Sequence, residues 1–433
     1  MGGERYVVLG LARAGSGWFR QVARWSTSAS LPIEFVKCVS VEELRSRLAT
    51  GRSFSAVLVD AHVPGVDRDL VDVSRQGGCA ALIVDDGRAR HDWHALGANA
   101  VLPGVFGRTE LLEALAATAS PVDRADAVIS SPNVRAEAAG WRGRLVAVTG
   151  VSGTGASTIA MAIAQGLGAD SRTASHVLLA DFALHADQSM LHDVGDVIPG
   201  VQELVEAHRG GVPSITETRA LTYEIRDRNY SLLLGLRRHR DWASIRPRAF
   251  DAALDGLRRC YKTVVADVTA DLEGEDQCGS VDVEDRNLMA RATASTADAV
   301  VIVGGAGPRA LHRLVRVVSA MREHGVPASR IVPVVNRGPR HPRARAELTA
   351  ALADLTQPLN ASGEPIGPPV QLAERRRLDD LIRDAMPLPH AFVDPITAAV
   401  SFVLEQSSAR EQPAEAAEPV PVVPGSLGSY FDD

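Results

Sequence analysis

The sequence is poor in the residues that mark a secreted, membrane-spanning or metal-centred protein. Its four cysteines (Cys38, Cys79, Cys260 and Cys278) lie far apart and form no C-x-x-C pair, so we expect reduced thiols and no cysteine metal site. No stretch reaches about 18 consecutive apolar residues, and the N-terminus lacks a charged segment followed by an apolar one. We therefore expect a cytoplasmic protein without a transmembrane segment.

Lysine is almost missing. Lys37 and Lys262 are the only lysines, so arginine carries nearly all of the positive charge. Arginines gather at 237–240, 337–345 and 375–377, but no aromatic residue is interleaved with them and the formal net charge is −7. Basic patches without stacking residues in an acidic chain are more typical of a solvated or salt-bridged surface than of a nucleic-acid interface. DNA is accordingly not an expected partner.

One loop keeps a phosphate-binding pattern but lacks its lysine. Residues 150–157, Gly-Val-Ser-Gly-Thr-Gly-Ala-Ser, match G-x-x-x-x-G-K-S/T at every fixed position except Ala156. An apolar strand-like run precedes the loop and a helical pattern follows it. The backbone N–H groups of such a turn, together with a helix N-terminus, bind phosphate. A drift from lysine to arginine would have left arginine at this position, so composition alone does not explain Ala156.

The organisation of the chain indicates an α/β protein with two doubly wound parallel-sheet domains, because short apolar runs alternate with helical patterns. Residues 1–118 form the first predicted domain, 119–142 a linker of small residues and proline, and 143–405 the second domain. Residues 406–433 are acidic and proline-rich, and we expect a disordered tail. The strand candidates are 6–9, 33–36, 56–59, 81–84 and 100–102, then 145–149, 177–181, 231–234, 263–267, 299–303 and 331–336.

Polar residues end three strands of the second domain in a fixed order. Asp181, Asp267 and Asn336 each close an apolar run behind the loop. This order resembles the MinD/ParA superfamily of deviant P-loop ATPases, and most of all its TadZ/CpaE-like branch, in which a receiver-like domain precedes the ATPase domain. The resemblance covers roughly residues 1–405.

The resemblance implies a site for ATP and Mg²⁺. The loop backbone would cradle the phosphates, Ser157 would ligate Mg²⁺, Asp267 would hold the ion through water, and Asn336 would read the adenine edge. The metal-binding residues implied are Ser157, Asp181 and Asp267. The cofactor-binding residues implied are Gly150, Gly153, Thr154, Gly155, Ala156, Ser157, Thr158 and Asn336.

Three departures from the family pattern weaken the expected chemistry. The signature lysine near the loop's start falls on Val151, the ordinary P-loop lysine on Ala156, and the switch I aspartate on Ala183. Phosphoryl transfer depends on such charges. We therefore expect a degenerate ATPase that binds ATP weakly or not at all, with little hydrolysis and no assigned catalytic residue. The competing interpretations are a plain tight turn without nucleotide and an active ATPase assisted by Arg309 or Arg337.

The first domain resembles response-regulator receivers around Asp60, which directly follows the strand 56–59 and falls at the phosphoacceptor position. The acidic pair expected after the first strand falls on Gly10 and Leu11, and the expected lysine falls on Gly104. Without these charges a phosphoryl group would meet no counter-charge, although Asp85-Asp86 offers a different acidic cluster. We expect a pseudo-receiver used for docking or dimerisation.

By resemblance, the protein would be a homodimeric localisation and assembly scaffold for a Tad-type pilus or secretion system. A secretion ATPase is the expected partner, and other components would recruit the scaffold to a pole or to the inner face of the membrane. The alternatives are an active ParA/MinD-type switch in DNA partitioning or septum-site placement, and a signalling protein controlled by phosphorylation of Asp60. Two surface features stay open: the acid-rich segment 271–285, as a solvated loop or a partner-facing surface, and residues 430–433, as a docking motif or disorder.

Overall fold

The computed structural model describes residues 5–13, 15–28, 30–49, 52–88, 91–122, 141–170, 176–360, 365–375 and 377–411. Most of the predicted linker lies outside these residues, as do residues 412–433 with their Tyr-Phe-Asp-Asp end. The last helix ends at Glu411, so it runs past the predicted boundary at residue 405. The domain boundaries themselves stay predictions.

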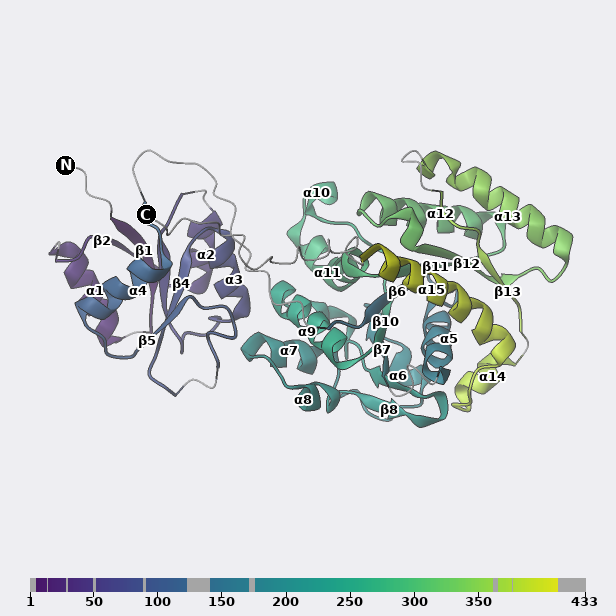
Figure 1. The fold of residues 1–433 in the computed structure, drawn as a ribbon, viewed down its shortest axis with the longest axis horizontal. Helices are drawn as coiled ribbons and strands as arrows, with labels where there is room; N and C mark the ends of the chain where they lie inside the picture. Colours follow the sequence, from purple (N-terminus) through teal and green to yellow (C-terminus); the bar gives the residue numbers. More distant parts are fainter. Residues whose placement is uncertain are drawn as a thin grey trace, which may run out of the picture.

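The N-terminal part is a parallel sheet covered by helices on both faces (Figure 1). Its strand order β2-β1-β3-β4-β5 places a topological switch point between β1 and β3, where a cleft forms at the carboxyl ends of the strands. Helices α2 and α3 pack on one face and α1 and α4 on the other. All five predicted strands are confirmed. The bounds are β1 Tyr6–Leu11, α1 Gly17–Thr27, β2 Ile33–Lys37, α2 Val41–Ala49, β3 Ala56–Asp60, α3 Arg68–Gln76, β4 Ala80–Asp85, β5 Ala100–Pro103 and α4 Arg108–Thr118.

The C-terminal part is built on an eight-stranded sheet of order β13-β12-β11-β6-β10-β7-β9-β8. The six predicted strands are confirmed, and two edge strands, β8 and β13, were not predicted. Strand β8 pairs antiparallel with β9. The sheet is therefore parallel, as predicted, except at this edge. The strand bounds are β6 Arg144–Gly150, β7 Val177–Phe182, β8 Tyr223–Ile225, β9 Tyr230–Leu233, β10 Thr263–Val268, β11 Ala299–Gly305, β12 Ile331–Gly338 and β13 Val370–Ala373.

Two helical layers bury this sheet. One apolar core joins the sheet to α7, α9, α11, α12 and α13, and a second joins it to α5 and α15. Helices α5 and α15 lie close together because Gly166 has no side chain: a Cβ there would lie 2.0 Å from Thr397 Oγ1. The bounds are α5 Ala156–Ala169, α6 Gln188–Leu191, α7 Val201–Gly210, α8 Ile215–Arg219, α9 Pro247–Cys260, α10 Glu275–Cys278, α11 Val281–Thr296, α12 Pro308–Glu323, α13 Pro342–Thr356, α14 Leu378–Arg383 and α15 His390–Glu411.

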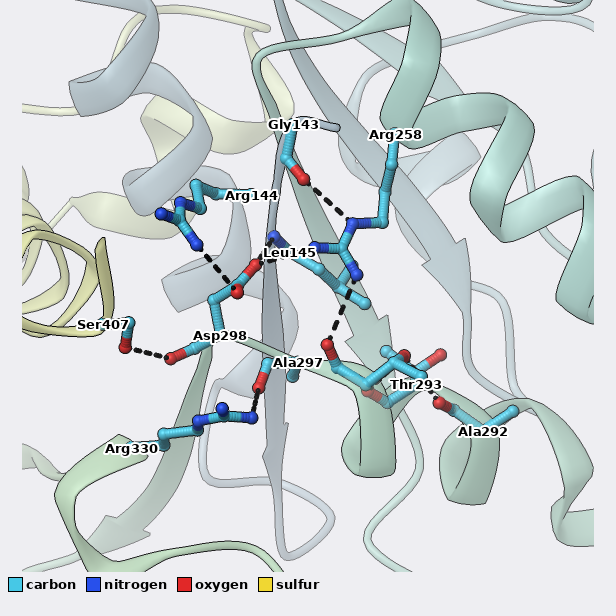
Figure 2. A network of polar contacts seen from close by, with 11 residues as sticks. Gly143, Arg144, Leu145, Arg258, Ala292, Thr293, Ala297, Asp298, Arg330 and Ser407 are labelled. Carbon is cyan, nitrogen blue, oxygen red and sulfur yellow. Dashed lines mark hydrogen bonds and ion pairs between the residues drawn. The ribbon is translucent and has the colours of Figure 1, made fainter. Parts of the chain in front are cut away.

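A buried carboxylate ties together the amino end of this sheet (Figure 2). Asp298, which directly precedes β11, accepts hydrogen bonds from the Leu145 backbone N–H at 2.7 Å and from the Arg144 and Arg258 guanidinium groups, each at 3.2 Å. Its own carbonyl oxygen accepts from Ser407 Oγ of α15. Four elements are therefore joined at one residue, on the edge opposite the glycine-rich loop.

The two sheets meet through α3, which contacts α7 and α9 (Figure 1). Arg68 donates to the carbonyl oxygens of His208 and Gly211. Asp69 accepts the Arg248 backbone N–H at 2.9 Å, in the first turn of α9, whose own N-cap residue makes no side-chain cap. A carboxylate at a helix N-terminus satisfies a free N–H and complements the helix dipole, so Asp69 caps a helix that belongs to the other sheet.

Candidate phosphate-binding site

The glycine-rich loop connects β6 to α5 at the carboxyl edge of the large sheet. Gly153 and Gly155 have φ angles of +81° and +87°, which residues with a side chain rarely adopt. Thr154 closes the turn, since its N–H and its hydroxyl both donate to the Val151 carbonyl oxygen, at 3.1 and 2.6 Å. The chain then enters a helix of 14 residues. The local backbone therefore has the form that binds phosphate: free N–H groups at a turn and at a helix N-terminus.

Asn336, at the end of β12, braces this loop. Its Nδ2 donates to the Thr154 carbonyl oxygen at 2.9 Å, and its Oδ1 accepts the Arg337 backbone N–H. The same Nδ2 lies 2.7 Å from the position that a Cβ of Gly155 would take, so only glycine fits there. The structure thus places Asn336 against the loop, in contact with its backbone. Its reading of adenine stays a prediction.

Two buried carboxylates lie beside the loop. Asp181 of β7 and Asp267 of β10 are paired in register on neighbouring strands, and their exposed fractions are 1% and 3%. Burial and the neighbouring Asp267 raise the pKa of Asp181 well above its usual value. Burial raises the pKa of Asp267 to about 6, against the lowering effect of hydrogen bonds from Ser157 and Gln188. Asp181 also accepts the backbone N–H groups of Ala183 and Gln188, so it caps the segment that follows its strand.

Gln188 connects all of these groups and was not predicted from the sequence. Its side chain is fully buried at the start of α6. Nε2 donates to Asp267 Oδ2 at 2.7 Å and to the Ser157 carbonyl oxygen at 3.2 Å, while the backbone N–H donates to Asp181 at 3.0 Å. Oε1 has no hydrogen-bond partner among the described residues. A lone glutamine after Asp187 carries no sequence signal for this role, because the role depends on β7, β10 and α5 meeting.

The residues present fit a hard divalent cation better than they fit a triphosphate. The Ser157 hydroxyl and the Asp267 carboxylate already contact one another, and oxygen ligands of this kind suit Mg²⁺. The loop supplies backbone donors for phosphate, but Val151, Ala156 and Ala183 add no charge. Arg337 is exposed next to Asn336, and Arg309 is exposed at the start of α12.

In the N-terminal sheet, Asp60 lies at the carboxyl end of β3 and is almost fully buried. Arg13 donates to its Oδ2 at 3.2 Å, and the His62 backbone N–H donates to its Oδ1 at 3.0 Å. With Asp86 and Gly104, these residues line a pocket of about 320 Å³. The Asp60 carboxylate therefore already has a cationic partner from its own chain.

One of the predicted acidic positions, Gly10, has no room for a side chain. A Cβ at Gly10 would lie 2.1 Å from the Phe35 ring, so that ring fills the place of an acidic side chain. Asp85 and Asp86 do gather as expected, and a ligand atom of each lies within 4.8 Å of one on His62. His62 also approaches Asp60 and Asp86, at 3.4 and 3.3 Å. Phosphorylation of Asp60 stays a prediction.

No protein-family model matches the chain, and no curated protein matches it. Solved structures that resemble it include a ParA family ATPase from Chlorobium tepidum, at 16% identity over 61% of this chain and 98% of that one, with a TM-score of 0.43. A septum site-determining protein MinD from Pyrococcus horikoshii, complexed with Mg-ADP, has 17% identity over 62% and 96%, with a TM-score of 0.41. A putative plasmid partition protein from Borrelia burgdorferi, bound to AMPPNP, has 16% identity over 61% and 99%, with a TM-score of 0.43. Within the described residues, no helix combines the length and the apolar character that a membrane span needs.

Proposed function

We propose that this chain is a MinD/ParA-like P-loop protein of the TadZ/CpaE kind, which binds ATP with Mg²⁺ weakly and hydrolyses it little. One observation carries the proposal. The loop keeps its left-handed glycines, its helix N-terminus and its buried carboxylate pair, while the three positions that should carry charge hold Val151, Ala156 and Ala183. The site keeps the parts that position a phosphate and lacks the parts that stabilise its transfer.

The chemistry left to the chain's own residues is binding and orientation. The N–H groups of the loop and of the first turn of α5 would donate hydrogen bonds to phosphate oxygens, and Ser157 with Asp267 would hold Mg²⁺, which supplies positive charge at the phosphates when bound. A charge-assisted hydrogen bond contributes about 1.5–3 kcal/mol. Losing one from ground-state binding therefore weakens affinity by about 10- to 100-fold. Hydrolysis suffers more, because the missing groups act chiefly on the transition state.

The proposed biological role is a homodimeric scaffold that positions or assembles a Tad-type pilus or secretion machine, with its secretion ATPase as partner. The N-terminal sheet supports a docking role, because Arg13 already neutralises Asp60 and Phe35 covers the place of the missing acid. The contact of α3 with α7 and α9 supports a single unit that presents both sheets to partners. Co-purification of the full chain with a Tad-type secretion ATPase tests this role, and a lack of any association would count against it.

The nucleotide part is tested by equilibrium titration with Mg²⁺-ATP and Mg²⁺-ADP, followed by a steady-state phosphate-release assay. We expect weak binding that Ser157→Ala abolishes, and little turnover. Ser152→Ala is the matched control, because Ser152 is an exposed loop serine at a position that the motif leaves free. Turnover at the rate of ordinary ParA ATPases would refute the degenerate site, and a complete lack of binding would reduce the loop to a structural turn.

An active nucleotide switch is the second candidate, and the position of Arg337 favours it. This residue has a left-handed backbone (φ +53°), is exposed, and donates its N–H to the Asn336 side chain that braces the loop. If its guanidinium replaces the missing charge, Arg337→Ala lowers phosphate release while Arg343→Ala, on α13, leaves it unchanged. Equal rates in both variants would eliminate this candidate.

A further inference from the structure

Gln188 lies among the residues that are predicted to bind metal. It contacts all three residues predicted to bind metal, through two N–H groups of its own backbone and side chain. The groups that it contacts are the carboxylates of Asp181 and Asp267 and the carbonyl oxygen of Ser157. All three are oxygen acceptors. A buried cluster of oxygen acceptors needs either hydrogen-bond donors or a cation, because it has lost its water.

The burial of the cluster makes this need strong. Gln188 is fully buried, and its contact with Asp267 at 2.7 Å is a short hydrogen bond to a carboxylate. At the same time Oε1 has no partner among the described residues. The amide nitrogen Nε2 is therefore hydrogen-bonded, whereas the amide oxygen Oε1 is not, within the part of the chain that the structure describes. A buried oxygen without a hydrogen-bond partner destabilises the folded chain.

We propose that Gln188 is an internal substitute for the metal ion, which holds the loop and the two carboxylates together when no cation is present and must move when a cation binds. The amide Nε2 donates to the Asp267 carboxylate, the acceptor that a cation would otherwise bind. When the side chain turns, the Asp267 carboxylate, which already contacts the Ser157 hydroxyl, becomes available to the ion, and Oε1 can accept a hydrogen bond from ion-bound water. This inference rests on the metal part of the proposed function, and it concerns the ion alone, without nucleotide.

The proposal predicts the effect of removing the donor. In the native chain an entering cation must first break the hydrogen bond from Gln188 to a charged carboxylate. Without that competition, we expect Gln188→Ala to bind a divalent cation about 10- to 100-fold more tightly, the factor that corresponds to one such hydrogen bond. The same variant should be less stable than the native chain in a chelator, and added cation should restore part of its melting temperature.

The experiment titrates the full chain with Mn²⁺ alone, followed by electron paramagnetic resonance of the free ion, and measures melting temperatures with chelator and with Mn²⁺. Gln165→Ala is the matched control: Gln165 is also a buried glutamine of this sheet's core, but its amide pairs with the backbone of Leu388, away from the carboxylates. It should lose stability without gaining affinity for Mn²⁺. If Gln188→Ala does not fold, Gln188→Asn withdraws the donor by one methylene and should change affinity in the same direction.

The results separate cleanly. Tighter Mn²⁺ binding in the Gln188 variant but not in the Gln165 variant supports the proposal. If Gln188→Ala binds Mn²⁺ with the affinity of the native chain, the proposal is overturned. Weaker Mn²⁺ binding would also overturn it, because Gln188 would then be a metal ligand itself. The failure of this inference is distinguishable from failure of the proposed function. If the chain binds no nucleotide but Gln188→Ala binds Mn²⁺ more tightly, this inference holds and the proposed function fails. If the chain binds nucleotide but Gln188→Ala does not bind Mn²⁺ more tightly, only this inference fails.

Discussion

Replacement of Asp298 should destabilise the large sheet more than any change to a surface ion pair. Its carboxylate accepts one backbone N–H and two guanidinium groups (Figure 2), and it is 4% exposed. Asp298→Ala removes the acceptor and leaves the Arg258 guanidinium, whose side chain is 14% exposed, without its carboxylate. The Leu145 N–H, at the start of the strand that carries the loop, loses its side-chain acceptor.

The size of the effect follows from these contacts. Breaking a buried ion pair by removing one partner costs about 3–5 kcal/mol, because an uncompensated charge stays buried. Domains are stable by only about 5–15 kcal/mol, so this loss is a large share of the total. An exposed pair contributes about 0–1 kcal/mol. The pair of Asp255 with Arg142, at 2.9 Å, has side chains that are 31% and 47% exposed, and it provides the matched control.

The measurement is urea unfolding of the full chain, followed by far-UV circular dichroism. We expect the Asp298→Ala midpoint to fall well below that of the native chain, and the Asp255→Ala midpoint to stay close to it. Added salt should diminish the Asp255 effect and leave most of the Asp298 effect, since a buried pair is screened less. Equal midpoints for the two variants would refute the reasoning, because burial would then not decide the cost.

Three further predictions rest on single contacts. Burial lowers the pKa of His192 to about 4. As the pH falls from 6.5 towards 4, the unfolded chain therefore takes up a proton that the folded chain refuses, and the free energy of unfolding should fall by up to about 3 kcal/mol. If His192 is responsible, the free energy of unfolding of His192→Asn, measured with urea, should depend less steeply on pH than that of the native chain. The same pH dependence in both would contradict this prediction. Gly166→Ala should push α15 away from α5 through a clash with Thr397 and cost about 1–3 kcal/mol or more in urea unfolding. Gly195→Ala, at an exposed position where a Cβ meets no described atom within 4 Å, should cost little, and equal losses in the two variants would contradict the clash. Asp69→Ala should cost about 1 kcal/mol through the lost cap on α9 and speed limited proteolysis between the two sheets; unchanged proteolysis would show that the cap does not hold them together.

Much of the fold could be predicted because strands of a parallel sheet are buried on both faces, so their sequences are continuous apolar runs. The eleven predicted runs are strands, and the carboxyl ends of parallel strands share one edge, so Asp181 and Asp267 had to come near the loop. Strand β8 escaped prediction because it has three residues, none of them buried, at an edge. Its antiparallel pairing depends on a turn through Asn229 in the left-handed conformation, which carries little signal in a single sequence.

The parts of the site that could not be predicted depend on contacts between distant segments. Gln188 acquires its role only when three elements meet, and nothing around it in the sequence distinguishes it from a surface glutamine. The absence of an acid at Gly10 was visible, but its physical reason, the Phe35 ring, lies on a neighbouring strand. The cap that Asp69 places on α9 joins residues 179 positions apart. Secondary-structure propensity depends on residues that are close in sequence, so it cannot predict contacts between such distant residues.

The packing of α15 on α5 also determines when the large sheet can complete its core during synthesis. Gln165 of the helix behind the loop exchanges two hydrogen bonds with Leu388, 223 residues further along the chain. At about 5–20 residues per second, a ribosome needs roughly ten to forty-five seconds to synthesise that interval. During this time the apolar face of α5, which α15 later covers, has no native partner. The loop-bearing sheet can therefore complete its core only after α15 has been synthesised, and chaperones that shield apolar helices have their greatest opportunity to act before then.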